Sequence, residues 1–225
     1  MRYLNKIVFI NSAAIRYSEV QLDGNIHLIG TQGVGKSTIL RAILFFYNAD
    51  TQRLGIPVEK KSYQDYYFPY ADSSIIYEVA REDGWFTVLS YKTMNRICYR
   101  FIASPYRSDL FIDEEGAPYP SDRIRSVLDK NGIKYSGAIS TYEEYRNILY
   151  GNSDNKRDYS CFSLMESGSY QNIIRTIQNV LLNSRLEADY IKQTIITSLN
   201  EADSVIDLSR YPVSYTHLTL PTKRI

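Results

Sequence analysis

Residues 30–37 read GTQGVGKS, and this stretch constrains the fold of the chain more than any other. It follows an apolar run at residues 26–29 and opens a segment, residues 38–47, with the apolar periodicity of a helix. Glycines let the backbone curl so that successive N–H groups point at a phosphate chain, with the positive end of a helix behind them. The order of strand, loop and helix predicts a phosphate-binding loop; a glycine-rich turn without a ligand is the alternative.

Two side chains of this loop carry charge or a metal-ligating hydroxyl. Lys36 can reach the β- and γ-phosphates of a nucleotide, and the Ser37 hydroxyl can ligate Mg²⁺. The chain is therefore expected to bind a nucleoside triphosphate, or to descend from chains that do.

The composition narrows the class of protein further. A chain of 225 residues can form one sizeable domain with its own core, and its 44% hydrophobic and 23% charged residues are typical of a globular protein. The net charge of +1 gives no global signature of nucleic-acid binding, so any DNA contact needs a local patch.

Cys98 and Cys161 lie far apart, and we expect buried reduced thiols rather than a disulfide or metal pair. No signal-peptide core and no run of about 18 apolar residues occur, which predicts a cytoplasmic protein without a membrane partner.

The apolar patterns predict an α/β chain with an antiparallel meander inserted after the first helix. The expected strands are residues 3–10, 19–22, 25–29, 74–81, 85–92, 96–102, 110–113 and 160–166, and the expected helices are residues 36–48, 121–130, 141–149 and 170–206, with residues 50–72 irregular. This pattern divides the chain into a lobe at residues 1–168, with the meander at about 74–113, a helical segment at 169–210 and a tail at 211–225.

The two C-terminal parts have separate interpretations. Apolar residues of the helical segment fall near a 3-4 alternation, which is compatible with the start of a coiled coil and equally with an amphipathic helix pair packed on the core. Residues 212–225, PVSYTHLTLPTKRI, resemble translated adapter read-through at the end of a truncated open reading frame; a natural disordered C-terminus is the alternative.

Residues 110–115, LFIDEE, have the form of a Walker B strand, in which Asp113 would steady Mg²⁺ and Glu114 would polarise the attacking water. A catalytic strand of this kind lies beside the phosphate-loop strand in a parallel sheet. No helical crossover precedes residue 110 within the meander, and Gly116 follows at once. A hairpin turn is therefore the favoured interpretation, and a compact NTPase or nucleotide kinase using Asp113 and Glu114 is the alternative function.

Taken together, the strand pair, the sequence IHLIGTQGVGKSTILRAILFFYNAD, the meander and the emerging long helix resemble the N-terminal half of an SMC-type ATPase head, closest to the MukB/JetC-like branch. The resemblance spans most of residues 1–210, and only the phosphate loop is a specific motif. It implies a P-loop NTPase half-head with a mixed sheet, which binds ATP and Mg²⁺ and is completed by a second half-head. It further implies a dimer of heads, accessory subunits and an action on DNA in chromosome maintenance, DNA repair or plasmid defence.

The resemblance also assigns residues to the site. The nucleotide contacts that it implies are Gly30, Thr31, Gln32, Gly33, Val34, Gly35, Lys36, Ser37 and Thr38, with Gln32 standing where many SMC proteins have Asn. A glutamine that meets Mg²⁺ and the attacking water is best matched by Gln171, with Gln178 and Gln64 as competitors and a surface glutamine as the alternative. No ABC signature of the L-S-G-G-Q type occurs in the sequence, so we expect weak ATP binding and no turnover from this chain alone.

The sequence leaves the roles of two further groups of side chains undecided. Arg53, Lys60 and Lys61 could touch phosphate or DNA, although a solvated loop is the favoured interpretation. The aromatic residues of the segment 63–70 could stack on a base, although packing in the core is favoured. A non-enzymatic interaction module stabilised by a nucleotide remains a third possible function.

Overall fold

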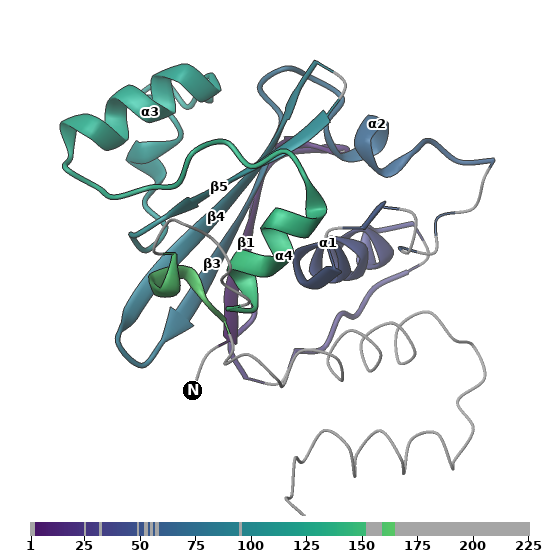
Figure 1. Ribbon diagram of the computed structural model, residues 1–225. Helices are drawn as coiled ribbons and strands as arrows, with labels where there is room; N and C mark the ends of the chain where they lie inside the picture. The colour runs from purple at the N-terminus through teal and green to yellow at the C-terminus, as the bar shows by residue number, and fades with distance from the viewer. Residues whose placement is uncertain are drawn as a thin grey trace, which may run out of the picture.

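A computed structural model describes residues 3–24, 26–31, 33–48, 50–51, 54, 56, 59–94, 96–151 and 159–164. Its centre is a five-stranded antiparallel sheet with the strand order β2-β1-β3-β4-β5 (Figure 1). The strands are β1 (Tyr3–Ser12), β2 (Ile15–Gln21), β3 (Ser74–Arg81), β4 (Gly84–Thr93) and β5 (Arg96–Ile102). The helices are α1 (Lys36–Asn48), α2 (Tyr63–Tyr67), α3 (Ser121–Lys130) and α4 (Tyr142–Leu149), with short 3-10 helices η2 (Ser108–Leu110) and η3 (Ser160–Phe162).

The two faces of the sheet carry two separate apolar clusters, because side chains alternate between the faces of each strand. On β1, Ile7 and Phe9 pack with α1, α2 and α4, whereas Val8 and Ile10 pack with α3 and the segment before it. Figure 1 shows this arrangement, with α1 and α4 on one side of the sheet and α3 on the other. β3 lies in the centre of the sheet, and all its residues except Arg81 are buried. The sheet is therefore covered on both faces.

Hydrogen bonds from tyrosine hydroxyls connect α1 to the rest of the fold. The hydroxyls that donate to its carbonyl oxygens are Tyr67 to Thr38 at 2.7 Å, Tyr77 to Ala42 at 3.1 Å, Tyr145 to Phe46 at 2.6 Å, and Tyr150 to Tyr47. The carbonyls of Phe46 and Tyr47 lie in the last turn, where a helix has no intrahelical donors left. Because the last turn of α1 holds no basic residue, these tyrosines take over its C-terminal capping. The abundance of tyrosine, 21 residues, thus has in part a structural reason.

The predicted meander is confirmed in β3, β4 and β5, and the helices predicted at residues 36–48, 121–130 and 141–149 are confirmed within one residue. The mixed sheet is not seen, because every strand pair in the described part of the chain is antiparallel. The strand predicted at residues 25–29 is wrong for residues 26–29, which form no ladder with any described strand. A strand needs a neighbour to satisfy its backbone groups, and residues 26–29 pair with neither edge strand, β2 or β5. Ile29 remains 90% exposed as a result.

Five other expectations need correction. The strand predicted at residues 19–22 is the end of the longer β2, and residues 63–67, expected to be irregular, form α2, which the Ser62 side chain caps. Residues 110–113 are not a strand: η2 ends at Leu110, and Ile112 forms only an isolated bridge with Pro118. The described part of the strand predicted at residues 160–166 contains η3 instead. Cys98 is buried as expected, but Cys161 is exposed, and neither forms a disulfide.

The predicted coiled-coil segment and the tail lie outside the described residues. None of the helices that the structure describes combines the length and apolar character needed to cross a membrane.

Candidate functional site

The glycine-rich loop leads directly into α1, which begins at Lys36. Gly35, just before the helix, has a φ of 94°, a backbone conformation that residues with a Cβ rarely adopt. Its carbonyl oxygen accepts hydrogen bonds from the backbone N–H groups of Thr38 at 3.0 Å and Ile39 at 3.1 Å, which start the first turn. The helix N-terminus therefore opens onto the loop, as an anion site requires.

The Lys36 ammonium folds back across this loop. Its Nζ donates to the carbonyl oxygen of Gly30 at 2.5 Å and to that of Thr31 at 2.7 Å. An ammonium has three N–H donors, so these contacts leave one of them uncommitted. Ser37, the next residue, is exposed, and its hydroxyl is accessible at the first turn of the helix. A cation and a hydroxyl thus stand together at the positive end of α1.

The loop forms one wall of a pocket of about 680 Å³. Of the lining residues that the structure describes, four are basic and none is acidic; the basic residues are Lys36, Arg41, Lys60 and Lys61. Such a concentration of one sign of charge attracts anions and raises their local concentration. The favoured interpretation of Lys60 and Lys61 as part of a solvated loop is therefore incomplete, since both side chains are exposed and both line the pocket. Arg53 lies outside the described residues.

α2 also contributes to the lining of this pocket, through Tyr66 and Tyr67. The side chain of Ser62 caps the helix by accepting from the backbone N–H of Asp65. The Tyr67 hydroxyl donates to the Thr38 carbonyl, and the hydroxyls of Tyr66 and Thr38 lie 3.3 Å apart. Burial raises the pKa of the Tyr67 hydroxyl, which is therefore a donor at neutral pH. The first turn of α1 is thus held by two neighbouring tyrosines.

The aromatic segment 63–70 divides between core and surface. Core packing is confirmed for Tyr63, Tyr67 and Phe68, which are at most 2% exposed. Tyr70 is 62% exposed and lies outside the pocket lining. Tyr66 differs from all of these, because it is 38% exposed and lines the pocket.

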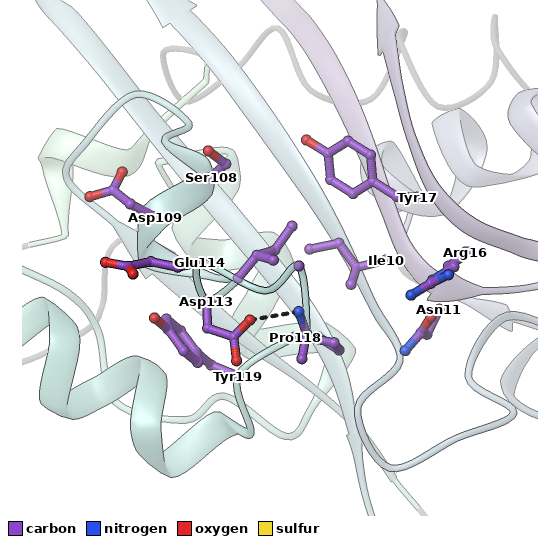
Figure 2. Close-up of a pocket in the computed structure, with 13 residues that line it drawn as sticks. Ile10, Asn11, Arg16, Tyr17, Ser108, Asp109, Asp113, Glu114, Pro118 and Tyr119 are labelled. Carbon is purple, nitrogen blue, oxygen red and sulfur yellow. Dashed lines mark hydrogen bonds between the residues drawn. The ribbon is translucent and has the colours of Figure 1, made fainter.

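Asp113 and Glu114 lie at a different pocket, of about 780 Å³, between the end of the β1–β2 hairpin and residues 108–119 (Figure 2). The Asp113 carboxylate accepts hydrogen bonds from the backbone N–H groups of Glu115 at 3.0 Å and Ala117 at 2.7 Å. The carbonyl of Asp113 accepts from the N–H of Gly116 at 3.0 Å. The interpretation of this segment as a turn is confirmed, and its carboxylate is used to hold that turn together. Phe111, two residues before Asp113, packs in the apolar cluster on the face of the sheet opposite α1.

The other predicted site residues are not brought to the glycine-rich loop by the described structure. Gln32, Gln171 and Gln178 lie outside the described residues. Gln64 lies on α2, where its carbonyl accepts from the N–H of Phe68, and it does not line the pocket. Within the described ranges, no group of three or more His, Cys, Asp or Glu side chains is arranged to hold a metal ion. A Mg²⁺ ion here would need ligands from Ser37 together with phosphate oxygens.

Fold and site define an α/β domain in which a helix, preceded by a glycine-rich loop with a lysine and a serine, packs on an antiparallel sheet. The chain belongs to the family described as "Protein of unknown function (DUF3584)", whose model matches residues 12–215. This family is found in RecF/RecN/SMC-type proteins, to which it is loosely related. No curated protein and no solved structure matches the chain significantly.

Sequence reasoning left one feature of the site undecided and missed another. The pocket position of Tyr66 was one of several possibilities within a tyrosine-rich run, and nothing in its spacing separated it from its neighbours. The inclusion of Arg41 was signalled by its place one helical turn after Ser37, which puts both residues on the same side of α1.

Proposed function

We propose that this chain is the ATP-binding N-terminal portion of an SMC-like ATPase of the MukB/JetC type. The parent protein would couple ATP hydrolysis to an action on DNA in chromosome maintenance, DNA repair or plasmid defence. The observation that carries the proposal is the Lys36 ammonium held by the Gly30 and Thr31 carbonyls at the open end of α1. In this position a cation closes a loop whose shape and charge suit a polyphosphate.

Each residue of the loop has a role in the proposed complex. The backbone N–H groups of residues 30–38 would cradle the phosphates, and Lys36 would exchange its carbonyl partners for β- and γ-phosphate oxygens. Ser37 would ligate Mg²⁺, which when bound supplies charge neutralisation on those oxygens. Lys60 and Lys61 add positive charge at the pocket wall without a role in the chemistry.

The segment before the loop supports the assignment as a half-head. Residues 26–30 form no ladder with any described strand, and Ile26 and Ile29 are 41% and 90% exposed. Exposed apolar side chains outside every described ladder are available for burial against another segment. A complementary half-head would supply that segment, together with the ABC signature and Walker B residues that this sequence lacks.

The test is nucleotide binding by the 225-residue chain, measured by isothermal titration calorimetry with a non-hydrolysable ATP analogue, with and without Mg²⁺. We expect Mg²⁺-dependent binding that falls at least tenfold in Lys36→Ala, because the ammonium neutralises the phosphates. Lys134→Ala, a substitution at an exposed lysine away from the pocket, should leave the affinity within twofold. Phosphate release from ATP should be no faster than for Lys36→Ala. Equal binding by wild type and Lys36→Ala, or no binding even with the complementary half-head, would overturn the proposal.

A further inference from the structure

Tyr66 stands apart from the other tyrosines around α1. The hydroxyls of Tyr67, Tyr77 and Tyr145 each donate a hydrogen bond to a backbone carbonyl of the helix, and these side chains are buried. Tyr66 instead lines the pocket and is 38% exposed. Among the hydrogen bonds of the described residues, the one that joins its side chain to the helix is a hydroxyl–hydroxyl pair with Thr38, at 3.3 Å. This contact is long for a hydrogen bond between hydroxyls, so it is easily exchanged for a better acceptor.

The ring of Tyr66 is positioned by its neighbour. It meets the Tyr67 ring edge-on, with 5.1 Å between centroids and an interplanar angle of 81°. Tyr67 is fixed in turn by its hydrogen bond to Thr38 and by Ser12, whose hydroxyl donates to the Tyr67 carbonyl at 2.8 Å. An aromatic side chain held in this way loses little conformational freedom when it contacts a ligand.

The pocket lining combines two kinds of chemistry. The Lys36 ammonium, held at Gly30 and Thr31, suits the terminal phosphates. Thr38, in the first turn of α1, and Tyr66, on α2, offer two hydroxyls beside a partly exposed aromatic side chain. Hydroxyls suit an α-phosphate or ribose oxygen, and an aromatic face suits a sugar or base.

We propose that Tyr66 contacts the nucleoside end of the bound nucleotide, through its hydroxyl paired with Thr38 and through its ring. The inference rests on the proposed nucleotide binding and adds the residue that distinguishes a nucleotide from a bare polyphosphate. Because every base has an aromatic face, the contact selects for a nucleoside rather than for one particular base.

The test compares ATP with inorganic tripolyphosphate, each with Mg²⁺, by calorimetry on the 225-residue chain. Tyr66→Ala should weaken ATP about tenfold or more and change tripolyphosphate less than twofold, because only ATP has a nucleoside. Tyr66→Phe retains the ring and should weaken ATP about threefold, the contribution of one hydroxyl. Tyr70→Ala and Tyr70→Phe are matched controls, since Tyr70 lies in the same segment but outside the pocket lining. Thermal melting of each variant verifies that it is folded.

The outcomes separate this inference from the proposed function. Equal losses for ATP and tripolyphosphate in Tyr66→Ala would assign Tyr66 to support of the loop and overturn the inference alone. Unchanged ATP affinity in Tyr66→Ala would do the same. Wild-type binding of tripolyphosphate without ATP would also overturn it, because the pocket would then have no place for a nucleoside. Wild type that binds neither ligand, even with the complementary half-head, contradicts nucleotide binding itself, and the role of Tyr66 with it.

Discussion

The Tyr145 hydroxyl donates a 2.6 Å hydrogen bond to the carbonyl oxygen of Phe46, a residue 99 positions away in the sequence. The donor lies on α4, and the acceptor lies in the last turn of α1. Burial raises the pKa of the Tyr145 hydroxyl well above its ordinary value, so it keeps its proton at any ordinary pH. The contact therefore ties the C-terminal end of the phosphate-loop helix to a helix that follows the meander.

Tyr145→Phe should reduce the free energy of unfolding by about 1–2 kcal/mol, because the Phe46 carbonyl would be left buried without this donor. Urea denaturation monitored by circular dichroism measures the loss. Tyr142→Phe is the matched control on the same helix, because Tyr142 is 52% exposed; it should change stability by less than about 0.5 kcal/mol. Equal stability of the two variants would show that the hydroxyl contributes nothing.

Glu78 is a buried carboxylate on β3 that joins two parts of the fold. One of its oxygens accepts from the Asn5 amide at 2.7 Å, and the other accepts from the backbone N–H of Tyr106 at 2.6 Å. Glu78→Gln replaces one acceptor oxygen by a donor, so one of these two groups loses its partner. We expect a loss of about 2 kcal/mol in unfolding free energy.

The same denaturation assay tests Glu78→Gln, with Glu115→Gln as the control. Glu115 is exposed, and only its backbone is used in the Asp113 turn. Wild-type stability in Glu78→Gln would show that the carboxylate is not needed to hold residue 106 against the sheet.

Glu19 should make the stability depend on pH in the acid range. Partial burial alone would raise the pKa of this carboxyl, but hydrogen bonds from Lys6 and Tyr17 outweigh it and lower the pKa below its ordinary value. A lowered folded-state pKa stabilises the fold above the unfolded-state pKa, about 4.3, and this contribution disappears as the pH falls through the folded-state value. The effect should stay below about 1 kcal/mol, because the Glu19 side chain is 36% exposed.

Unfolding free energies of wild type and Glu19→Gln, measured between pH 2.5 and 7, check this expectation. The difference between them should be largest near neutral pH and should shrink toward the acid end. Glu115→Gln should give a curve parallel to that of wild type, and a constant gap for Glu19→Gln would contradict the assigned hydrogen bonds.

Gly35→Ala should impair the phosphate loop without unfolding the protein. A Cβ at Gly35 would meet no atom within 4 Å, so the penalty comes from its φ of 94° alone. Relief of this strain distorts the loop, and we expect at least a tenfold loss of tripolyphosphate affinity with a melting temperature within 2 °C of wild type.

Gly132→Ala is the matched control for Gly35→Ala. Gly132 has a φ of 63° and equally free space, but it ends α3, where its N–H donates to the Asp129 carbonyl and that of Ile133 to the Leu128 carbonyl. This variant should lose about 1 kcal/mol of stability and keep its affinity. If both glycine variants behave alike, the loop conformation has no special role.

Apolar runs and turn residues correctly predicted several of the strands and turns. β3 and β5 were predicted with their observed bounds, because apolar runs bounded by turn residues mark strands of a meander. The turn at Asp113 was anticipated from the glycine that follows Glu115, although the strand before it was not observed. The strand prediction was wrong for residues 26–29, because a strand is defined by pairing with a neighbour, and an apolar run does not reveal whether a neighbour is present.

The sequence could indicate site residues that are consecutive, but not which distant residues pack beside them. The loop from Gly30 to Ser37 could be proposed as a site because its residues are consecutive and form a sequence motif. Tyr66, Lys60 and Lys61 reach the pocket from a segment with a weak periodic pattern, whose path depends on how α2 packs on α1. Such contacts are set by the packing of the aromatic core, where many tyrosines are interchangeable in sequence but not in space.

The tyrosine contacts to α1 have a mechanical consequence. Apolar side chains tolerate a small rotation of a helix about its own axis, whereas directional bonds from Tyr67 near one end and Tyr145 near the other resist it. The rotation of the helix, and with it the direction of the amide groups at its beginning, is thereby coupled to α2 and α4, and through the bond from Tyr77 to Ala42 also to β3. A displacement of any of these elements would therefore be transmitted to the glycine-rich loop.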